Sequence, residues 1–342
     1  MSFVIFDEAF YLNSNPDVKQ AVQAGSIKSG LDHFIQYGLK EKRVNVSPFY
    51  NEEFYLQTNP AVAQAVKDGN FASGLDHFIQ FGETEARSPS ALFDEQKYLQ
   101  RYPDIAAAVK AGSLSSGLAH FLQFGQSEGR HGTPFVESIY RGGYPDVDQA
   151  VKAGVLKSGL EHYLLYGQYE NRTGVFQGDS GINDTITGFG KDARIYGVSV
   201  APFISPLNDY QQINKSFWSV GNSQPNEVDV LIGSPEKDTF SLSDVFDRKM
   251  PYYGRSLYAQ SGDNDYALIQ NFEVGKDKLV LVGNLDNYQF VPTNGNLQVY
   301  IVSNYTNTPV NPPELIAILS GVNSADSITN SLAFSVRTLV TY

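Results

Sequence analysis

Along the first half of the chain, apolar residues cluster at the spacing of short amphipathic helices rather than in the strict alternation of strands. Near the start there are three such clusters, at residues 10–12, 18–22 and 31–35. Each follows a residue that commonly caps a helix N-terminus, namely Asp7, Asn15 and Ser29. The pattern therefore predicts three short helices, the third with Leu31, Phe34 and Ile35 as its buried stripe.

The predicted helix ends also follow from local residues. Pro16 suits the first position of the second helix, where no N–H is needed, and Gly25 predicts a left-handed cap at its end. Ser29 and Asp32 form a predicted capping box at the start of the third helix, which Gly38 is expected to end. Helices of about two turns are not stable alone in water, so they must be stabilised by packing.

The same three-helix pattern returns three more times, which identifies a repeat array. The segment SGLDHFIQYG at 29–38 recurs as SGLDHFIQFG at 73–82, SGLAHFLQFG at 116–125 and SGLEHYLLYG at 158–167. Each copy contains one histidine and is followed by a Glu-x-Arg sequence. We place the units at about residues 6–43, 49–87, 93–130 and 135–172. We expect them to bury their apolar faces against one another in a solenoid-like or compactly wound array.

The fourth unit departs from this pattern at its start. Val136 stands where the first unit has the capping residue Asp7, and Arg141 replaces Leu12. Terminal repeats commonly differ because they contact something other than another repeat. We expect the second half of the chain to be this different neighbour.

Helical periodicity stops near Gly174, where short apolar runs bounded by Gly, Asn, Asp and Pro begin. Strands are predicted at residues 228–232, 239–242, 266–272, 278–282, 297–302, 315–319 and 332–336. A loop is predicted at 303–313. We therefore expect an α+β protein of two domains, an α-helical repeat domain over residues 1–173 and a β-rich domain over residues 174–342.

Composition narrows the choice of partners. The formal net charge of −12 argues against nucleic acid and anionic membrane surfaces, which need clustered Lys and Arg. The chain has no cysteine, which excludes disulfides, thiolate metal sites and Cys nucleophiles. No run of about 18 apolar residues occurs, so no membrane span is expected. The first residues lack the basic and apolar regions of a Sec signal peptide.

Two sets of motifs resemble secreted bacterial proteins. The units of the form YLxxNPDV…SGLxHYxxFGxxEGR resemble repeats attached to secreted and cell-surface proteins. Fragments at 178–186, 229–240, 262–272 and 275–281 resemble the nonapeptide GGxGxDxUx of the RTX (haemolysin-type calcium-binding) family. In that family, glycine turns and Asp carboxylates bind Ca²⁺ between the coils of a parallel β-roll.

The RTX resemblance implies a degenerate β-roll or sandwich-like domain and export by a type I system. It also implies calcium as a cofactor, with Asp184, Asp238, Asp263 and Asp265 as the carboxylates that would bind it. A second interpretation is that the fragments are worn repeats that form ordinary β-turns without a metal.

We find no catalytic motif in the sequence. The four repeat histidines lack the i+3 or i+4 partner of a metal site, so we interpret them as structural residues that hydrogen-bond a backbone carbonyl. The Glu-x-Arg sequences are interpreted as local ion pairs, with a binding surface as the alternative. The second half has no histidine, and the chain lacks HExxH, P-loop and GxSxG motifs. We therefore predict no enzymatic activity.

These observations predict a secreted, extracellular structural protein that assembles with itself into a surface layer, filament or matrix. The alternative is an adhesin-like extracellular module that binds a glycan, such as a cell-surface polysaccharide. Tyr252, Tyr253 and Tyr258 would then offer aromatic surfaces for sugars, although they are also typical of partly buried strand residues.

Overall fold

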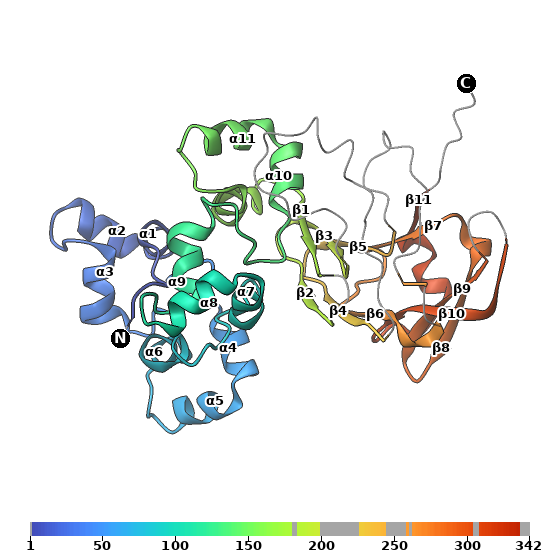
Figure 1. The fold of residues 1–342 in the computed structure, drawn as a ribbon, viewed down its shortest axis with the longest axis horizontal. Helices are drawn as coiled ribbons and strands as arrows, with labels where there is room; N and C mark the ends of the chain where they lie inside the picture. Colours follow the sequence, from blue (N-terminus) through green and yellow to red (C-terminus); the bar gives the residue numbers. More distant parts are fainter. Residues whose placement is uncertain are drawn as a thin grey trace. The chain divides into compact units, whose positions relative to one another are not determined.

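The computed structural model describes residues 2–179, 183–198, 226–243, 258–259, 262–303 and 308–335. The chain divides into two compact units, Met1–Thr133 and Pro134–Tyr342. The first contains the helices of three repeats, and the second contains the fourth repeat and the described strands (Figure 1). Helical repeats followed by strands were predicted, and this order is confirmed. The division between compact units falls one repeat before the change in sequence pattern at residue 174.

Each repeat contains two short helices and then a one-turn helix that continues into a π-helical turn. The first repeat has α1 (Glu8–Ser14), α2 (Pro16–Gln23), α3 (Gly30–His33) and the π turn Phe34–Gly38. The second has α4 (Glu52–Thr58), α5 (Pro60–Lys67), α6 (Gly74–His77) and Phe78–Gly82. The third has α7 (Glu95–Arg101), α8 (Pro103–Lys110), α9 (Gly117–His120) and Phe121–Gly125. The fourth has α10 (Glu137–Gly143), α11 (Pro145–Lys152), α12 (Gly159–His162) and Tyr163–Gly167.

Most of the predicted helix signals are confirmed. Asp7 accepts a hydrogen bond from a backbone N–H in the first turn of α1, and Pro16 is the first residue of α2. Gly25 follows α2 with a φ of +72°, the left-handed conformation that glycine adopts without strain. The hydroxyl of Ser29 accepts from the N–H of Asp32 at 3.0 Å. These signals are short-range, which is why they can be read from the sequence.

Three details differ from the prediction. Asn15 occupies the N-cap position of α2, but its side chain makes no cap bond and donates to the carbonyl of Tyr11 at 2.8 Å instead. In the second repeat, the carboxylate of Asp76 accepts from the N–H of Ala72, so the expected reciprocal bond of the capping box is made one residue earlier. The helix that begins after Ser29 ends at Gly38 as predicted, but its second half, Phe34–Gly38, is a π turn rather than a continuation of the α-helix.

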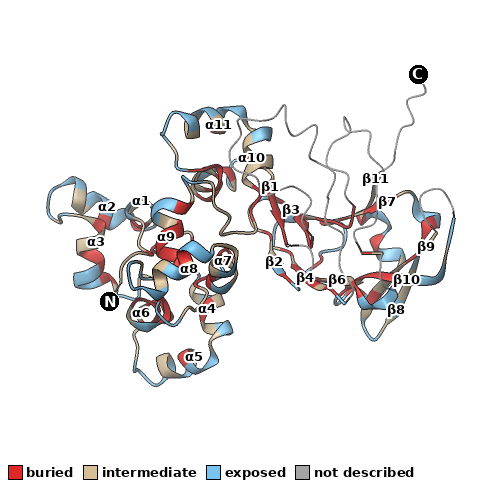
Figure 2. Ribbon diagram, in the orientation of Figure 1, coloured by how far each residue is buried: buried red, intermediate tan, exposed pale blue. Residues whose placement is uncertain are grey.

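Each repeat encloses its own aromatic core. Phe6 directly precedes the N-cap residue of α1, and Tyr11 is the fourth residue of that helix. Their ring centroids are 5.0 Å apart, as in a hydrophobic staple. Both rings pack on Phe34, at 5.3 and 5.6 Å. The equivalent triads are Tyr50, Tyr55 and Phe78; Phe93, Tyr98 and Phe121; and Phe135, Tyr140 and Tyr163. We expected the apolar faces to be buried mainly between repeats, whereas these rings pack on one another within a repeat. Figure 2 marks the buried residues along the ribbon.

Contacts between the repeats of the first unit are fewer and partly polar. Phe49 of the second repeat packs edge-on against Phe121 of the third, with centroids 5.8 Å apart. Glu83 accepts hydrogen bonds from Ser115 and Ser116 at the start of α9, at 2.8 and 2.9 Å. The N–H of Ser2 donates to the carbonyl of Ile79 at 3.0 Å, which places the N-terminal segment against the second repeat.

The strands of the second unit form two sheets. The bounds are β1 (Gly174–Gln177), β2 (Thr185–Thr187), β3 (Asp192–Tyr196), β4 (Val228–Ile232), β5 (Lys237–Ser241), β6 (Tyr266–Gln270), β7 (Lys278–Val282), β8 (Tyr288–Thr293), β9 (Asn296–Ser303), β10 (Pro309–Leu319) and β11 (Leu332–Ser335). One sheet has the order β1-β3-β5-β7-β11, with every neighbouring pair parallel. The other has the order β2-β4-β6-β10-β9-β8, with β2, β4, β6 and β10 parallel and β10-β9-β8 antiparallel.

From β1 to β7, successive strands alternate between the two sheets. All seven predicted strands are present, with β4 and β7 at the predicted bounds. The predicted loop at 303–313 is partly wrong, because residues 309–313 belong to β10; residues 304–307 lie outside the described residues. Strands β1, β2, β3 and β8 were not predicted. The first two have only four and three residues, too few to show a period.

The fourth repeat packs against the edge of the first sheet. Phe135 forms an isolated antiparallel bridge with Phe176 of β1. The N–H of Val136 donates to the carbonyl of Val175 at 2.7 Å, and the N–H of Gln177 donates to the carbonyl of Pro134 at 2.8 Å. The segment therefore covers backbone groups of an edge strand that would otherwise be open to pairing. This explains why a valine replaces the capping Asp, and it confirms the expected neighbour of the fourth repeat.

Candidate functional site

A tyrosine–histidine pair lies inside every repeat, and both residues are buried in all but the fourth repeat, where His162 is partly exposed. The Tyr11 hydroxyl is 2.9 Å from Nδ1 of His33, and both side chains are buried. The equivalent pairs are Tyr55–His77 at 2.9 Å, Tyr98–His120 at 2.8 Å and Tyr140–His162 at 3.0 Å. The predicted structural role of the histidines is supported, but their partner is a tyrosine hydroxyl rather than the backbone carbonyl that we expected. Burial raises the pKa of Tyr11 to about 12.

The glycine at the end of each π turn leaves room for this tyrosine. A Cβ atom on Gly125 would lie 2.6 Å from the Tyr98 hydroxyl and 3.4 Å from Nδ1 of His120. A Cβ atom on Gly38 would likewise lie 2.6 Å from the hydroxyl of Tyr11. Real Cβ atoms do not approach oxygen so closely, so these positions require glycine for space and not for a left-handed backbone.

A glutamate at the start of the first helix caps the third helix of the same repeat. Glu95 is buried, and its carboxylate accepts from the N–H groups of Gly117 and Leu118 at 2.6 and 2.8 Å. Glu8, Glu52 and Glu137 make the same pair of bonds in the other repeats. Sequence reasoning missed these residues, although they recur in the register of the histidines. The carboxylate lies at the N-terminal end of this helix, where the helix dipole favours a negative charge.

The Glu-x-Arg sequences form local ion pairs, as predicted. The Arg43 guanidinium donates to Glu41 at 2.6 Å and to both carboxylate oxygens of Asp17 at 2.7 and 2.9 Å. The hydrogen bonds from Arg43 lower the pKa of Asp17 to about 2. The second repeat has Ala61 at the position of Asp17, and there Arg87 donates to Asn59 at 2.5 Å. In the last two repeats the arginine also lies over a tyrosine ring, Arg130 over Tyr102 and Arg172 over Tyr144.

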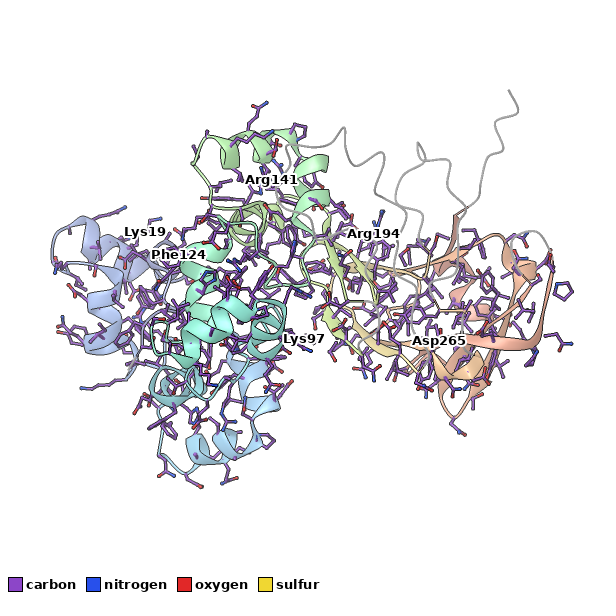
Figure 3. All side chains as sticks on the ribbon, in the orientation of Figure 1. Lys19, Lys97, Phe124, Arg141, Arg194 and Asp265 are labelled. Carbon is purple, nitrogen blue, oxygen red and sulfur yellow. The ribbon has the colours of Figure 1, made fainter. Side chains whose placement is uncertain are left out.

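A half-exposed aromatic ring lies four residues after each histidine. The exposed fractions of Tyr37, Phe81, Phe124 and Tyr166 fall between 46% and 52%. Each ring contacts the histidine of its own repeat, with centroids 5.6 to 5.9 Å apart. We call the ring, this histidine and the glutamate of Glu-x-Arg the ring site; Phe124 is labelled in Figure 3.

In three of the four ring sites, a short gap separates the histidine from the glutamate. Nε2 of the histidine lies 4.0 Å from Glu41 in the first repeat, 3.6 Å from Glu128 in the third and 4.0 Å from Glu170 in the fourth. These separations exceed the 2.7–3.2 Å of an ordinary N–H···O hydrogen bond.

The first repeat exposes an apolar position that is buried in the second and fourth repeats and partly buried in the third, where Leu122 occupies it. The exposed fraction of Ile35 is 47%, whereas those of its equivalents Ile79 and Leu164 are 3%. Leu31 is only partly buried, whereas Leu75, Leu118 and Leu160 are buried. The predicted buried stripe of the third helix is therefore wrong at Ile35. We call Leu31 and Ile35 the open face of the first repeat.

No protein-family model and no curated protein matches the chain. Within the described ranges, no helix is long and apolar enough to cross a bilayer. In the same part of the chain, no three His, Asp or Glu residues are grouped so that they could hold a metal ion.

The second unit contains a series of buried aspartates at the starts of strands. Asp184, Asp229, Asp238, Asp265 and Asp277 are buried, and each is followed two residues later by a buried apolar residue. The N–H of Asp184 donates to the carboxylate of Asp229 at 2.8 Å, and the N–H of Asp238 donates to that of Asp277 at 2.9 Å. Neighbouring parallel strands are therefore tied by carboxylates as well as by the backbone ladder.

The structure does not bring the four predicted calcium ligands together. Asp184 and Asp265 lie at strands β2 and β6 of one sheet, and Asp238 lies in β5 of the other (Asp265 is labelled in Figure 3). Asp263 is exposed and accepts from the N–H of Leu315 at 3.0 Å. Sequence reasoning missed Asp229, although it also begins an Asp-x-apolar sequence.

Of the tyrosines considered as sugar platforms, Tyr252 and Tyr253 lie outside the described residues. Tyr258 is fully buried, and its hydroxyl donates to Asp229 at 2.5 Å. Tyr258 is therefore a core residue and offers no surface to a ligand.

Proposed function

We propose that this chain is a non-catalytic extracellular structural protein that associates with further copies of itself through the open face of its first repeat. The observation that carries the proposal is the contrast between Ile35 and its equivalents. An isoleucine or leucine at this position is almost fully buried in the second and fourth repeats, and half-exposed in the first. Covering such a side chain is favourable by about 25 cal/mol per Å² of apolar surface removed from water.

A second copy of the chain is the occupant that the repeat pattern favours. In the second repeat, the equivalent face lies beside the N-terminal segment, whose Ser2 N–H donates to the carbonyl of Ile79. In the third, the start of the corresponding helix contacts the Glu83 turn of the repeat before it. The second and third repeats thus already pack against other segments of the same chain. A second copy of the chain would supply such segments to the open face of the first repeat. Contacts of this head-to-tail kind extend into open assemblies unless a rotation closes them.

We propose at the same time that the chain has no catalytic role. The histidines, glutamates and arginines that recur in the repeats are used to hold each repeat together. We also propose that the second unit is a degenerate β-roll, because strands β1 to β7 alternate between two sheets in which they pair in parallel, and five of them begin with an Asp-x-apolar sequence. A secreted location and export by a type I system follow from the RTX resemblance and remain part of the proposal.

Sedimentation velocity of the full chain over a wide concentration range tests self-association. We expect a sedimentation coefficient that rises with concentration, and we expect Ile35→Lys to abolish the rise. This variant lowers the net negative charge, so a loss of association cannot be ascribed to added repulsion. Val155→Lys is the matched control, because Val155 has an exposed fraction of 76% and lies in another repeat. A chain that stays monomeric throughout, or an Ile35→Lys variant that associates like the control, would refute the proposal.

A further inference from the structure

The ring and its histidine contact recur in all four repeats, and the close approach of the histidine to the glutamate recurs in three. The core is completed by the aromatic triad and the tyrosine–histidine pair, and the half-exposed ring lies outside both. Nearby surface positions show no such restriction: the position of Tyr169 is occupied by Lys40, Thr84 and Ser127 in the other repeats. An aromatic ring is about half exposed at four equivalent positions. Exposing apolar surface to water is unfavourable, so such a repeated ring offers a surface on which a ligand can pack.

The third repeat shows which polar groups border the ring. Burial lowers the pKa of His120, which keeps its imidazole neutral at neutral pH. We assign the accepting role to Nδ1, which faces the Tyr98 hydroxyl, and the proton to Nε2, which faces the carboxylate of Glu128. This assignment directs an N–H donor and a carboxylate acceptor at the gap of 3.6 Å beside the ring of Phe124.

A hydroxyl group has the chemistry to bridge such a gap. It accepts a hydrogen bond from Nε2–H through its oxygen and donates its own proton to the carboxylate. Water molecules bridge polar groups in the same way when the groups are slightly too far apart to bond directly. A ligand that carries a hydroxyl next to an apolar C–H face can form this bridge and pack on the ring at the same time.

We propose that each ring site binds one sugar residue of a neutral polysaccharide. The C–H face of the sugar packs on the exposed aromatic ring, and one of its hydroxyls lies beside the histidine–glutamate pair, within hydrogen-bonding distance of both side chains. Charge favours a neutral ligand: beside Phe124, two carboxylates (Glu128 and Asp104) and one guanidinium (Arg130) leave a net charge of −1. Uronic or sulfated sugars would be repelled by this surface and by the net charge of −12.

Several weak sites on one chain suit a polymer of repeating sugars. A glycan that engages a second site after the first does so at a high effective concentration, so the combined affinity far exceeds that of a single site. This inference goes beyond self-association and uses different residues, since the open face consists of Leu31 and Ile35.

Native affinity electrophoresis of the full chain tests the proposal. The gels contain a mixed-linkage β-glucan, a galactomannan, a dextran or polygalacturonate, and a gel without polysaccharide is the reference. We expect retardation by at least one neutral polysaccharide and none by polygalacturonate. We expect Phe124→Ala to lower the apparent association constant by about tenfold, and the combined variant Y37A/F81A/F124A/Y166A to abolish retardation.

Two comparisons separate binding from general effects of the substitutions. Tyr169→Ala removes a ring with an exposed fraction of 62% that belongs to no ring site, and we expect it to leave retardation unchanged. Glu128→Gln keeps the side-chain shape but weakens the acceptor, so we expect partial loss of retardation. Circular dichroism confirms that each variant is folded, and Ile35→Lys is run in parallel so that self-association does not contribute to avidity.

Three results would overturn the inference: no retardation in any neutral gel, full retardation of the combined ring variant, or retardation by polygalacturonate alone. A failure of self-association with retained retardation would reject only the proposed function. Self-association without retardation in any neutral gel would reject only the ring sites.

Discussion

Placing a methyl group on Gly125 tests whether the tyrosine hydroxyl is the reason for glycine at the end of each π turn. The new Cβ atom of Gly125→Ala would lie 2.6 Å from the Tyr98 hydroxyl, and overpacking of this kind costs about 1–3 kcal/mol of unfolding free energy. Tyr98→Phe removes that oxygen and with it the 2.8 Å bond to His120. Leaving Nδ1 of the buried imidazole without its partner costs about 1–2 kcal/mol.

The double variant separates this explanation from a simple preference for glycine. Once the hydroxyl is gone, the nearest remaining atom to the new methyl group is Cδ2 of Phe121 at 3.2 Å, a contact that small shifts relieve. We therefore expect the double variant to be close in stability to Tyr98→Phe alone. The cost of the two changes together should fall short of their sum by about 1–2 kcal/mol.

Hydrogen exchange of the full chain, followed by mass spectrometry on peptides from residues 94–130, measures the local unfolding free energy of this repeat. Gly112→Ala is the control. Gly112 has a φ of +73°, and a Cβ atom added there would have no other atom within 4 Å, so its cost comes from the backbone and should add to that of Tyr98→Phe. If the effects of Gly125→Ala and Tyr98→Phe are additive within about 0.5 kcal/mol, the steric explanation is wrong.

Two further predictions concern strained backbone and buried carboxyl groups. Ala86 of the second repeat has a φ of +54°, and Gly129 occupies the equivalent position in the third. Ala86→Gly should therefore stabilise the second repeat by about 1 kcal/mol, and Gly129→Ala should destabilise the third. Thermal melting measures both changes. Burial raises the pKa of Asp229 and Asp238 to about 7, far above the value of about 3.9 in an unfolded chain. Between these values the folded state binds protons that the unfolded state releases, so the unfolding free energy of the second unit should fall as the pH rises from about 4 to 7. Hydrogen exchange of β4 and β5 at pH 5 and pH 8 measures this fall; Asp238→Asn should reduce it, and a rise in stability with pH would contradict the assignment.

The parts of the fold that were predictable depend on neighbours in sequence. Caps such as Asp7 and Ser29, the proline at the start of α2 and the left-handed Gly25 act within one turn of a helix, so their residue types are sufficient signals. The π turns were not predictable, because the apolar pattern from residue 31 to 35 fits a regular helix equally well.

The missed features depend on partners that are distant in sequence. Glu8 bonds to N–H groups 22 and 23 residues further along the chain, and Asp229 meets Asp184 only when the register of β2 and β4 is fixed. The ring sites were missed because Phe34 and Tyr37 are both aromatic residues of one short helix. Only the packing of three helices determines that the first is buried and the second half-exposed.

The bonds that close a repeat have a consequence for how the gene can change. Tyr11–His33, Glu8–Gly30 and Arg43–Asp17 all join residues of the same block, as their counterparts do elsewhere. Duplication or deletion of one entire block would preserve every one of these bonds, whereas a breakpoint between Asp17 and Gly30 would separate all three pairs at once. The bonds within a block are thus compatible with recombination in whole blocks, provided that the block with Phe135 and Val136, which seals the edge of β1, remains last.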